Sequence, residues 1–182
     1  GKDAALADCL EARVQARHPT SKVVHRLDKD TSGVLLMALN KKALGYLGSQ
    51  FEARMTRKSY VARVWGDVAG EAGSIDLPLA TDWENKPRQR VDFERGRPSQ
   101  TEWQVIAREA GVTRLRLTPI TGRTHQLRVH LMEIGHPILG DQFYATGEAL
   151  AAADRLQLHA ESLSFRHPAD GVERTFVAPC PF

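Results

Sequence analysis

The sequence lacks the features that would place the protein outside the class of ordinary globular domains. Its longest uninterrupted apolar run is the six residues 34–39, far short of the ~20 residues that cross a membrane. It has only two cysteines, Cys9 and Cys180, near opposite ends, which excludes a disulfide framework and paired zinc ligands. No glycine-rich loop precedes a helix with a phosphate-binding lysine, which argues against nucleotide hydrolysis. Such sparing use of cysteine favours the reducing cytoplasm as the location.

Metal-ligand patterns are lacking as well. The seven histidines are scattered, and His125 and His130 stand five residues apart without a carboxylate at ligand spacing. We therefore expect no metal site. Most histidines are expected to be hydrogen-bonded structural residues or to face phosphate groups.

Acidic residues are missing from two segments, although the net charge is only +3. Residues 53–66 hold four basic side chains and no acid, and residues 113–136 hold four arginines and three histidines against Glu133 alone. Eighteen of the 25 basic residues are arginine, the residue that suits bidentate phosphate contacts and stacking on bases. Arginine-rich codon usage would give the same count. The clustering nevertheless favours a face that binds a polyanion.

At 182 residues the chain is long enough for one domain with a sizeable core. Apolar spacing predicts helices over residues 3–17, from Asn40 to about Phe51, and over 124–134. Strands are expected over 33–39, 58–65, 74–79, 89–93, 99–107, 112–118, 161–166 and 174–178. Runs of strands with few helices between them indicate an α+β fold with a mixed, largely antiparallel sheet.

The segment that says most about chemistry is residues 25–33, HRLDKDTSG. His25, Arg26 and Asp28 stand just before a glycine turn and the apolar run 34–39, an arrangement by which a rigid scaffold presents a polar loop to a substrate. An isolated aspartate beside an arginine is more often a surface ion pair. Taken alone, the segment leaves open whether Asp28 is a catalytic carboxylate.

Several segments together resemble the RluA family of RNA pseudouridine synthases. Residues 25–36 are similar to that family's signature loop. Residues 58–66, KSYVARVWG, are similar to its second motif, and residues 122–130, GRTHQLRVH, with 135–141, GHPILGD, to its third. The segments 158–160 and 165–168 fit its C-terminal strands. Residues 76–79, 82–89 and 101–103 most resemble the small A-type members, which act on 23S rRNA and on the tRNA anticodon stem-loop.

The resemblance implies a pseudouridine synthase fold, with a mixed, mainly antiparallel sheet flanked by helices and loops. We expect residues 1–182 to form a single catalytic domain that lacks the family's N-terminal strand and first motif and has no separate RNA-binding domain. The implied reaction is isomerisation of specific uridines to pseudouridine in 23S rRNA, the tRNA anticodon stem-loop, or both. Because the same base is donor and acceptor, no cofactor or metal is expected. The enzyme is expected to be a cytoplasmic monomer whose partner is RNA.

The same resemblance implies roles for individual residues. Asp28 would be the essential carboxylate, acting either as a nucleophile or as a base, and the sequence does not choose between them. Tyr60 would stack on the flipped uracil, although a tyrosine on a strand more often belongs to the core. Arg128 would pair with Asp28. Arg26 would fill the stack that the flipped base leaves.

Further residues are predicted to contact RNA without reading its sequence. They are His25, Thr31, Arg57, Lys58, Arg123 and His125. The alternative function is a non-catalytic RNA-binding module, or a ribosome-assembly factor, built on the same fold. Only turnover of uridine would distinguish the two.

Overall fold

The computed structural model describes residues 8–182, which divide into two compact units. The first unit comprises the described residues up to Arg26 together with Leu35–Thr56 and Ser164–Thr175. The second comprises Leu27–Val34, Arg57–Leu163 and Phe176–Phe182. The second unit contains the residues expected to carry the chemistry.

The first unit is built around helix α2, Lys41–Glu52. Asn40 begins this helix, and its side-chain Oδ1 accepts a hydrogen bond from the Ala43 N–H at 2.9 Å, as expected for an N-cap. Leu47 is buried. The unit also contains helix α1 (Leu10–Gln15) and the antiparallel strand pair β1 (Lys22–Val23) and β3 (Met37–Ala38). The prediction of α2 is confirmed, whereas the helix predicted over 3–17 is present only at Leu10–Gln15, and residues 3–7 lie outside the described chain.

Most of the strands form one seven-stranded sheet with the order β11-β10-β4-β9-β8-β5 and with β2 beside β10. The bounds are β2 Ser32–Gly33, β4 Arg57–Trp65, β5 Ala72–Asp76, β8 Gln100–Glu109, β9 Val112–Pro119, β10 Leu158–Arg166 and β11 Glu173–Val177. The pairs β4/β9, β8/β9 and β5/β8 are antiparallel, and β2/β10 is parallel. The predicted mixed, mainly antiparallel α+β fold is confirmed.

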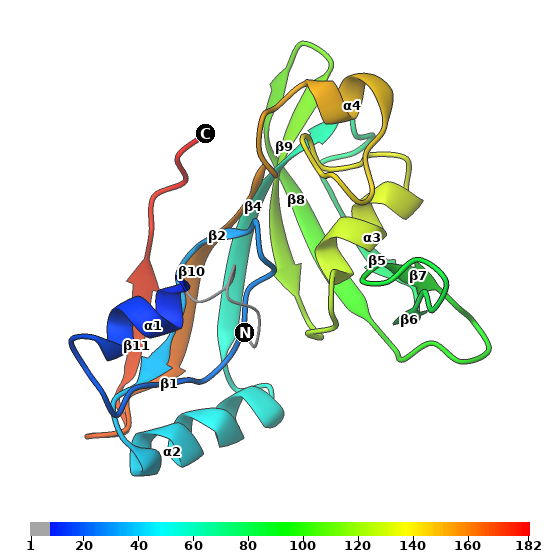
Figure 1. Cartoon of the computed structure of the whole chain (residues 1–182). Coiled ribbons are helices and arrows are strands. Elements are labelled where there is room, and N and C mark those ends of the chain that lie inside the picture. The colour runs from blue at the N-terminus through cyan, green and yellow to red at the C-terminus, as the bar shows by residue number, and fades with distance from the viewer. Residues whose placement is uncertain (1–7) are drawn as a thin grey trace. The chain divides into compact units, whose positions relative to one another are not determined.

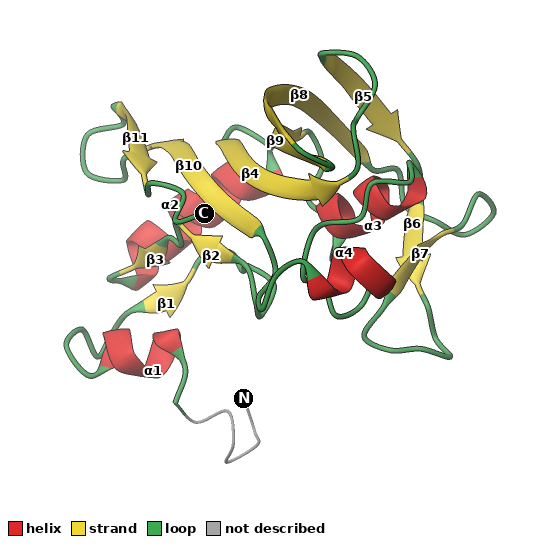
Figure 2. Ribbon diagram, turned by 90° about the horizontal axis from the view of Figure 1, so that it is seen from above, coloured by secondary structure: helices red, strands yellow, loops and turns green. Residues whose placement is uncertain are grey.

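The core of the second unit lies between the sheet and helix α3, Gln126–Glu133. In Figure 1 this helix, coloured yellow-green, lies alongside β8 and β9. Successive side chains of a strand point to opposite faces, so Ala62 and Val64 of β4 share one face. Leu127 and Leu131 of α3 pack against that face. Two small elements were not predicted: strand β6 (Leu79–Thr81), which pairs with β7 (Gln89–Val91), and helix α4 (Gly147–Ala151). Both are too short for a clear apolar period, and Figure 2 shows them near α3.

The continuous strand predicted over residues 33–39 is wrong. Ser32 and Gly33 pair with β10, whereas Met37 and Ala38 pair with β1, and the residues between them are not in a strand. Gly33 has φ +114°, and a Cβ there would lie 2.1 Å from the Ala160 carbonyl oxygen. Only glycine fits this close approach. The backbone turns at this point, and the apolar run is divided between two partners.

Helices long and apolar enough to cross a membrane are not found among residues 8–182.

A buried histidine makes the stability of the second unit depend on pH. His130 is fully buried in α3, with Nδ1 3.0 Å from Thr101 Oγ1 and Nε2 3.0 Å from the Leu77 carbonyl oxygen. Burial lowers the pKa of His130 below its usual 6.5, against the smaller opposing effect of the Leu77 carbonyl. The folded state therefore resists protonation, and the unfolded state binds the extra proton below pH 6.5.

We predict that the stability from neutral His130 is complete above pH 6.5 and is lost progressively as pH falls below it. Denaturant unfolding at about pH 7.5 and about pH 5.5 should show a smaller pH slope for His130→Gln than for the wild type. His18→Gln, at an exposed histidine, is the control and should keep the wild-type slope. Equal slopes for wild type and His130→Gln would contradict the prediction.

Candidate active site

Asp28 is the first residue of a tight turn, and the residues that follow the turn are hydrogen-bonded to strand β10. The Thr31 N–H donates to the Asp28 carbonyl oxygen at 3.0 Å, and the Val34 N–H donates to the Ala160 carbonyl oxygen at 2.9 Å. Between them, Ser32 Oγ lies 2.8 Å from His159 Nδ1. The loop is thereby fixed to strand β10, while 20% of the Asp28 side chain remains exposed. A carboxylate held this way is preorganised and still reachable from solvent.

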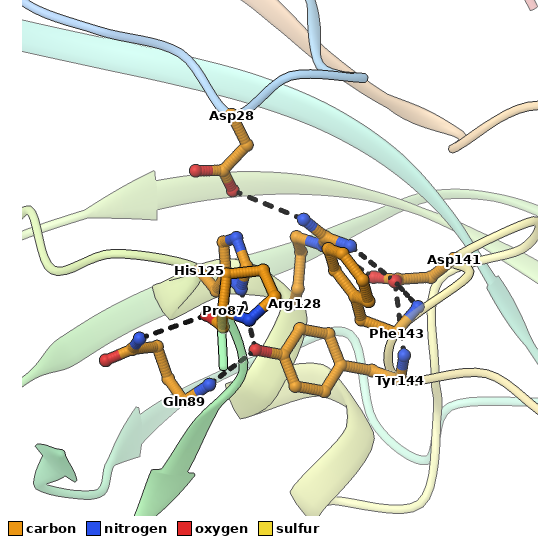
Figure 3. Close-up of polar contacts among 8 residues, drawn as sticks. All are labelled: Asp28, Pro87, Gln89, His125, Arg128, Asp141, Phe143 and Tyr144. Carbon is orange, nitrogen blue, oxygen red and sulfur yellow. Dashed lines mark hydrogen bonds and ion pairs between the residues drawn. The ribbon is translucent and has the colours of Figure 1, made fainter. Parts of the chain in front are cut away.

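The carboxylate of Asp28 faces the guanidinium of Arg128, which projects from α3 (Figure 3). Arg128 Nη1 lies 3.7 Å from Asp28 Oδ2. A second carboxylate, Asp141, binds the other edge of the same group, with Nε–Oδ2 at 2.7 Å and Nη2–Oδ1 at 2.6 Å. The geometry brings together Asp28 and Arg128, which the resemblance had paired, and adds Asp141 as the tighter partner.

Arg128 lies closer to Asp141 than to Asp28, so Asp141 is its main counter-charge. Arg128 and Asp141 are both buried, so each needs the other's charge. Burial alone would lower the pKa of Arg128, but the hydrogen bonds and the charge of Asp141, helped by Asp28, raise it instead. Since Asp141 already balances the cation, Asp28 is held by a single longer contact. Its carboxylate stands beside a permanent positive charge and makes no shorter contact with it.

The turn after Asp141 fixes the orientation of the ion pair. Asp141 Oδ1 accepts the backbone N–H of Phe143 at 2.9 Å and that of Tyr144 at 3.2 Å. The two aromatic rings lie against Arg128, whose Cζ is 5.1 Å from the Phe143 centroid and 5.2 Å from that of Tyr144. Cation–π contact favours a guanidinium at this distance. The arginine is therefore enclosed by one carboxylate and two rings.

Tyr60 belongs to both the core and the site. It lies on β4 opposite Leu117 and packs against the core cluster of the sheet and α3. Burial, together with the charge of Asp28, raises the pKa of Tyr60 to about 12. The phenol therefore keeps its proton at neutral pH, so its hydroxyl can donate a hydrogen bond there. The charge of Asp28 thus acts on the Tyr60 hydroxyl.

Three of the predicted RNA contacts lie on or next to the Asp28 loop. Arg26 is exposed and belongs to the first unit. His25, in the same unit, accepts the Leu36 N–H at Nε2, 3.0 Å away, and stacks on the Phe51 ring. Thr31 Oγ1 is shielded from solvent and has no hydrogen-bond partner among the described residues. Their contacts with RNA stay predictions.

The other four predicted contacts come from β4 and from the segment before α3. Arg57 is exposed at the start of β4. Lys58, next to it, is half-buried, and burial lowers its pKa. A Cβ on Gly122 would lie 3.6 Å from Lys58 Nζ, which puts this amine beside the segment that carries Arg123. His125, by contrast, is buried, with Nδ1 2.7 Å from the Tyr144 hydroxyl.

A groove of about 400 Å³ runs beside this segment. We call it the arginine groove, and the residues that line it are Leu79, Ala80, Thr81, Trp83, Gln89, Arg90, Asp92, Arg95, Arg97, Gly122, Arg123 and Thr124. Four of them are arginines, against the single acid Asp92. Trp83 is 74% exposed, and Lys86 Nζ lies 3.8 Å from the centroid of its ring. Positive charge beside an exposed aromatic ring suits a single-stranded or looped nucleic acid.

Metal coordination has no support in the described chain: between residues 8 and 182, no three His, Cys, Asp or Glu side chains group so that they could hold an ion.

Sequence reasoning missed Asp141 and most of the arginine groove. Asp141 lies within residues 135–141, which carried part of the resemblance, but no role was given to it. The available signal was that a buried arginine requires a carboxylate, yet a sequence does not reveal which acid folds against it. Arg90, Arg95 and Arg97 lie in or near segments that were read only as a strand and polar turns.

Comparison with known proteins identifies RNA pseudouridine synthases among the relatives of this chain. The sequence profile of the family described as RNA pseudouridylate synthase matches residues 3–133. The chain is 53% identical over 176 residues to the dual-specificity RNA pseudouridine synthase RluA of Yersinia pestis, covering 96% of this chain and 85% of that protein. It is 52% identical over 176 residues to the RluA of Escherichia coli K12, covering 96% and 80%.

Solved structures of similar fold are RNA pseudouridylate synthase domains as well. Human RNA pseudouridylate synthase domain containing 1 superposes with a TM-score of 0.85 at 32% identity, covering 97% of this chain and 76% of that one. Human RNA pseudouridylate synthase domain containing 4 gives a TM-score of 0.76 at 25% identity, covering 100% and 80%.

We predict that Asp141→Asn lowers the free energy of unfolding by about 3 kcal/mol, because it leaves a buried guanidinium without its main counter-charge. Denaturant unfolding monitored by circular dichroism measures the change. Asp8→Asn, which breaks the exposed pair with Arg13, is the matched control and should leave stability unaltered. An Asp141→Asn protein as stable as the wild type would show that Arg128 does not depend on this partner.

Proposed function

The chain belongs to the RNA pseudouridylate synthase family, and we propose that it modifies two kinds of structured RNA with Asp28 as the catalytic carboxylate. It is an isomerase that converts uridine in RNA to pseudouridine. The Yersinia and Escherichia relatives are named dual-specificity enzymes. Together with the A-type motifs over residues 76–103, this supports 23S rRNA and the tRNA anticodon stem-loop as the two substrates.

The observation that carries the assignment of Asp28 is its position beside a cation that another acid already neutralises. Arg128 Nη1 is 3.7 Å from Asp28, while Asp141 holds the opposite edge at 2.6 and 2.7 Å. An ionised carboxylate near a fixed positive charge, partly exposed and on a fastened loop, suits nucleophilic or base catalysis.

The reaction exchanges one glycosidic bond for another. The bond from N1 of uracil to C1′ of ribose breaks, the base turns, and a bond from C5 to C1′ forms. The hydrogen on C5 leaves as a proton, and N1 gains one. As a nucleophile, Asp28 would bond to C1′ as the bond to N1 breaks and be released when C5 attacks C1′. As a base, it would take a ribose proton as the bond to N1 breaks and return that proton to the ribose when the bond from C5 to C1′ forms. In either route Tyr60 would stack on the uracil and Arg128 would hold the Asp28 carboxylate in position.

Before this chemistry the uridine must leave its stack, at a cost of a few kcal/mol. We propose that exposed Arg26, two residues before Asp28, occupies the vacated space. Phosphates on either side would be held by basic side chains from β4 and the arginine groove. Lys58 supports this role, because it is half-buried and no carboxylate of the described chain is paired with it.

The remaining proposals concern the state in which the enzyme works. We propose a cytoplasmic monomer that uses neither a metal nor a cofactor. Chemistry supports the part of the proposal that concerns metals and cofactors: donor and acceptor are the same base, so the reaction has no net redox change and transfers no group to a second molecule.

We predict that Asp28→Asn abolishes pseudouridine formation while RNA affinity changes little. The assay is release of tritium from stem-loop RNA labelled at C5 of uracil, since only turnover frees that hydrogen. Asp30→Asn, which neutralises an exposed acid two residues away, is the matched control and should turn over normally. Turnover by Asp28→Asn would refute the catalytic assignment, and a wild-type protein that binds RNA but releases no tritium would favour the non-catalytic RNA-binding module.

We predict that a double variant, Arg95→Ala with Arg97→Ala, weakens RNA binding and makes it less sensitive to salt. Each lost phosphate contact should reduce the slope of log K against log salt by about 0.7–0.9. Filter binding or fluorescence anisotropy over a salt series measures this slope. Arg174→Ala, an exposed arginine on β11, is the control. An unchanged slope in the double variant would argue against the arginine groove as an RNA surface.

A further inference from the structure

The side chain of Tyr144 connects the arginine groove to Arg128, the cation beside Asp28. Tyr144 is 8% exposed, and its hydroxyl oxygen accepts the backbone N–H of Gln89 at 2.8 Å. The same oxygen lies 2.7 Å from His125 Nδ1. Figure 3 shows these contacts below the Arg128 guanidinium. One side chain therefore touches β7, the residue before α3, and the cation of the site.

On the catalytic side, Tyr144 acts on Arg128 in two ways. Its ring lies 5.2 Å from Arg128 Cζ, and its backbone N–H donates to the carboxylate of Asp141. His125 adds a further constraint, because it directly precedes α3 and has a left-handed backbone with φ 53°. Such a conformation is uncommon for a residue other than glycine and must be held by its surroundings. The bond to the Tyr144 hydroxyl is one of the contacts that hold it.

On the groove side, the contact is made by the backbone. Gln89 and Arg90 both line the arginine groove and are consecutive in β7. The bond from Gln89 N–H to Tyr144 anchors this strand at its first residue. A ligand that contacts the Arg90 side chain therefore acts one residue away from the backbone bond to Tyr144.

We propose that the Tyr144 hydroxyl is a positioning group that couples RNA in the arginine groove to the placement of Arg128 against Asp28. Strand β7, the hydroxyl and the aromatic ring form one continuous chain of contacts from the groove to the guanidinium. This inference rests on the proposed function, because it assigns the groove to RNA and the reaction to Asp28.

The Tyr144 hydroxyl, and not the ring alone, makes the contacts with Gln89 and His125. Burial raises the pKa of Tyr144 to about 12, so the phenol keeps its proton at neutral pH. A backbone N–H can only donate, so the oxygen accepts from Gln89 and its own proton is available to His125 Nδ1. Phenylalanine would preserve the ring over Arg128 and lose both hydrogen bonds.

The first test is Tyr144→Phe, measured by tritium release under single-turnover conditions and by RNA binding. We expect the rate at saturating RNA to fall about tenfold while Kd stays within about twofold, because Arg128 loses its alignment and the groove keeps its charges. A purely structural role would lower stability and leave this rate unchanged. Tyr46→Phe, at an exposed tyrosine of the first unit, is the matched control and should behave as the wild type.

The second test is a double-mutant cycle between Tyr144→Phe and Arg90→Ala. If the hydroxyl carries the coupling, Arg90→Ala slows turnover of bound RNA in the wild type but has no such effect in Tyr144→Phe. Independent, multiplicative losses would overturn the proposal, and so would an unchanged saturating rate in Tyr144→Phe. Wild-type turnover and an inactive Asp28→Asn in the same assay test the proposed function separately, so failure of the one is distinguishable from failure of the other.

Discussion

The buried ion pair between Arg128 and Asp141 is the interaction on which the candidate site depends. A guanidinium and a carboxylate taken out of water are tolerable only when paired with good geometry. Here two contacts of 2.6 and 2.7 Å, with two backbone donors on the same carboxylate, meet that condition. The functional consequence is that Arg128 lies beside Asp28 while its own charge is already balanced by Asp141.

The fold supplies this pair with two fixed platforms. Helix α3 carries Arg128 and packs its leucines on the sheet, so the arginine cannot withdraw without disturbing the core. The loop with Asp28 is fastened to β10, and Gly33 permits the close approach to Ala160. The carboxylate of Asp28 and the cation beside it thus come from elements far apart in the chain, and each is held by the same sheet.

The site and the arginine groove are neighbours in structure because residues 122–124 line the groove just before His125, and because Tyr144, after Asp141, binds the backbone of Gln89 in the groove. Arg123 lines the groove, whereas His125, two residues later, is buried against Tyr144. Phosphate contacts position a nucleic acid without reading its sequence.

The sequence by itself determined the local elements and the family. Asn40 identified the start of α2, alternation identified β4, and ordered motifs identified the family, because these signals lie in consecutive residues. The tertiary structure alone decided that residues 33–39 divide between two partners, that His125 turns inward, and that Asp141 holds Arg128. Each of these depends on a partner distant in the chain: Ala160 for Gly33, Tyr144 for His125, and a carboxylate thirteen residues away for Arg128. Burial and pairing arise from the packed fold, and no local pattern encodes them.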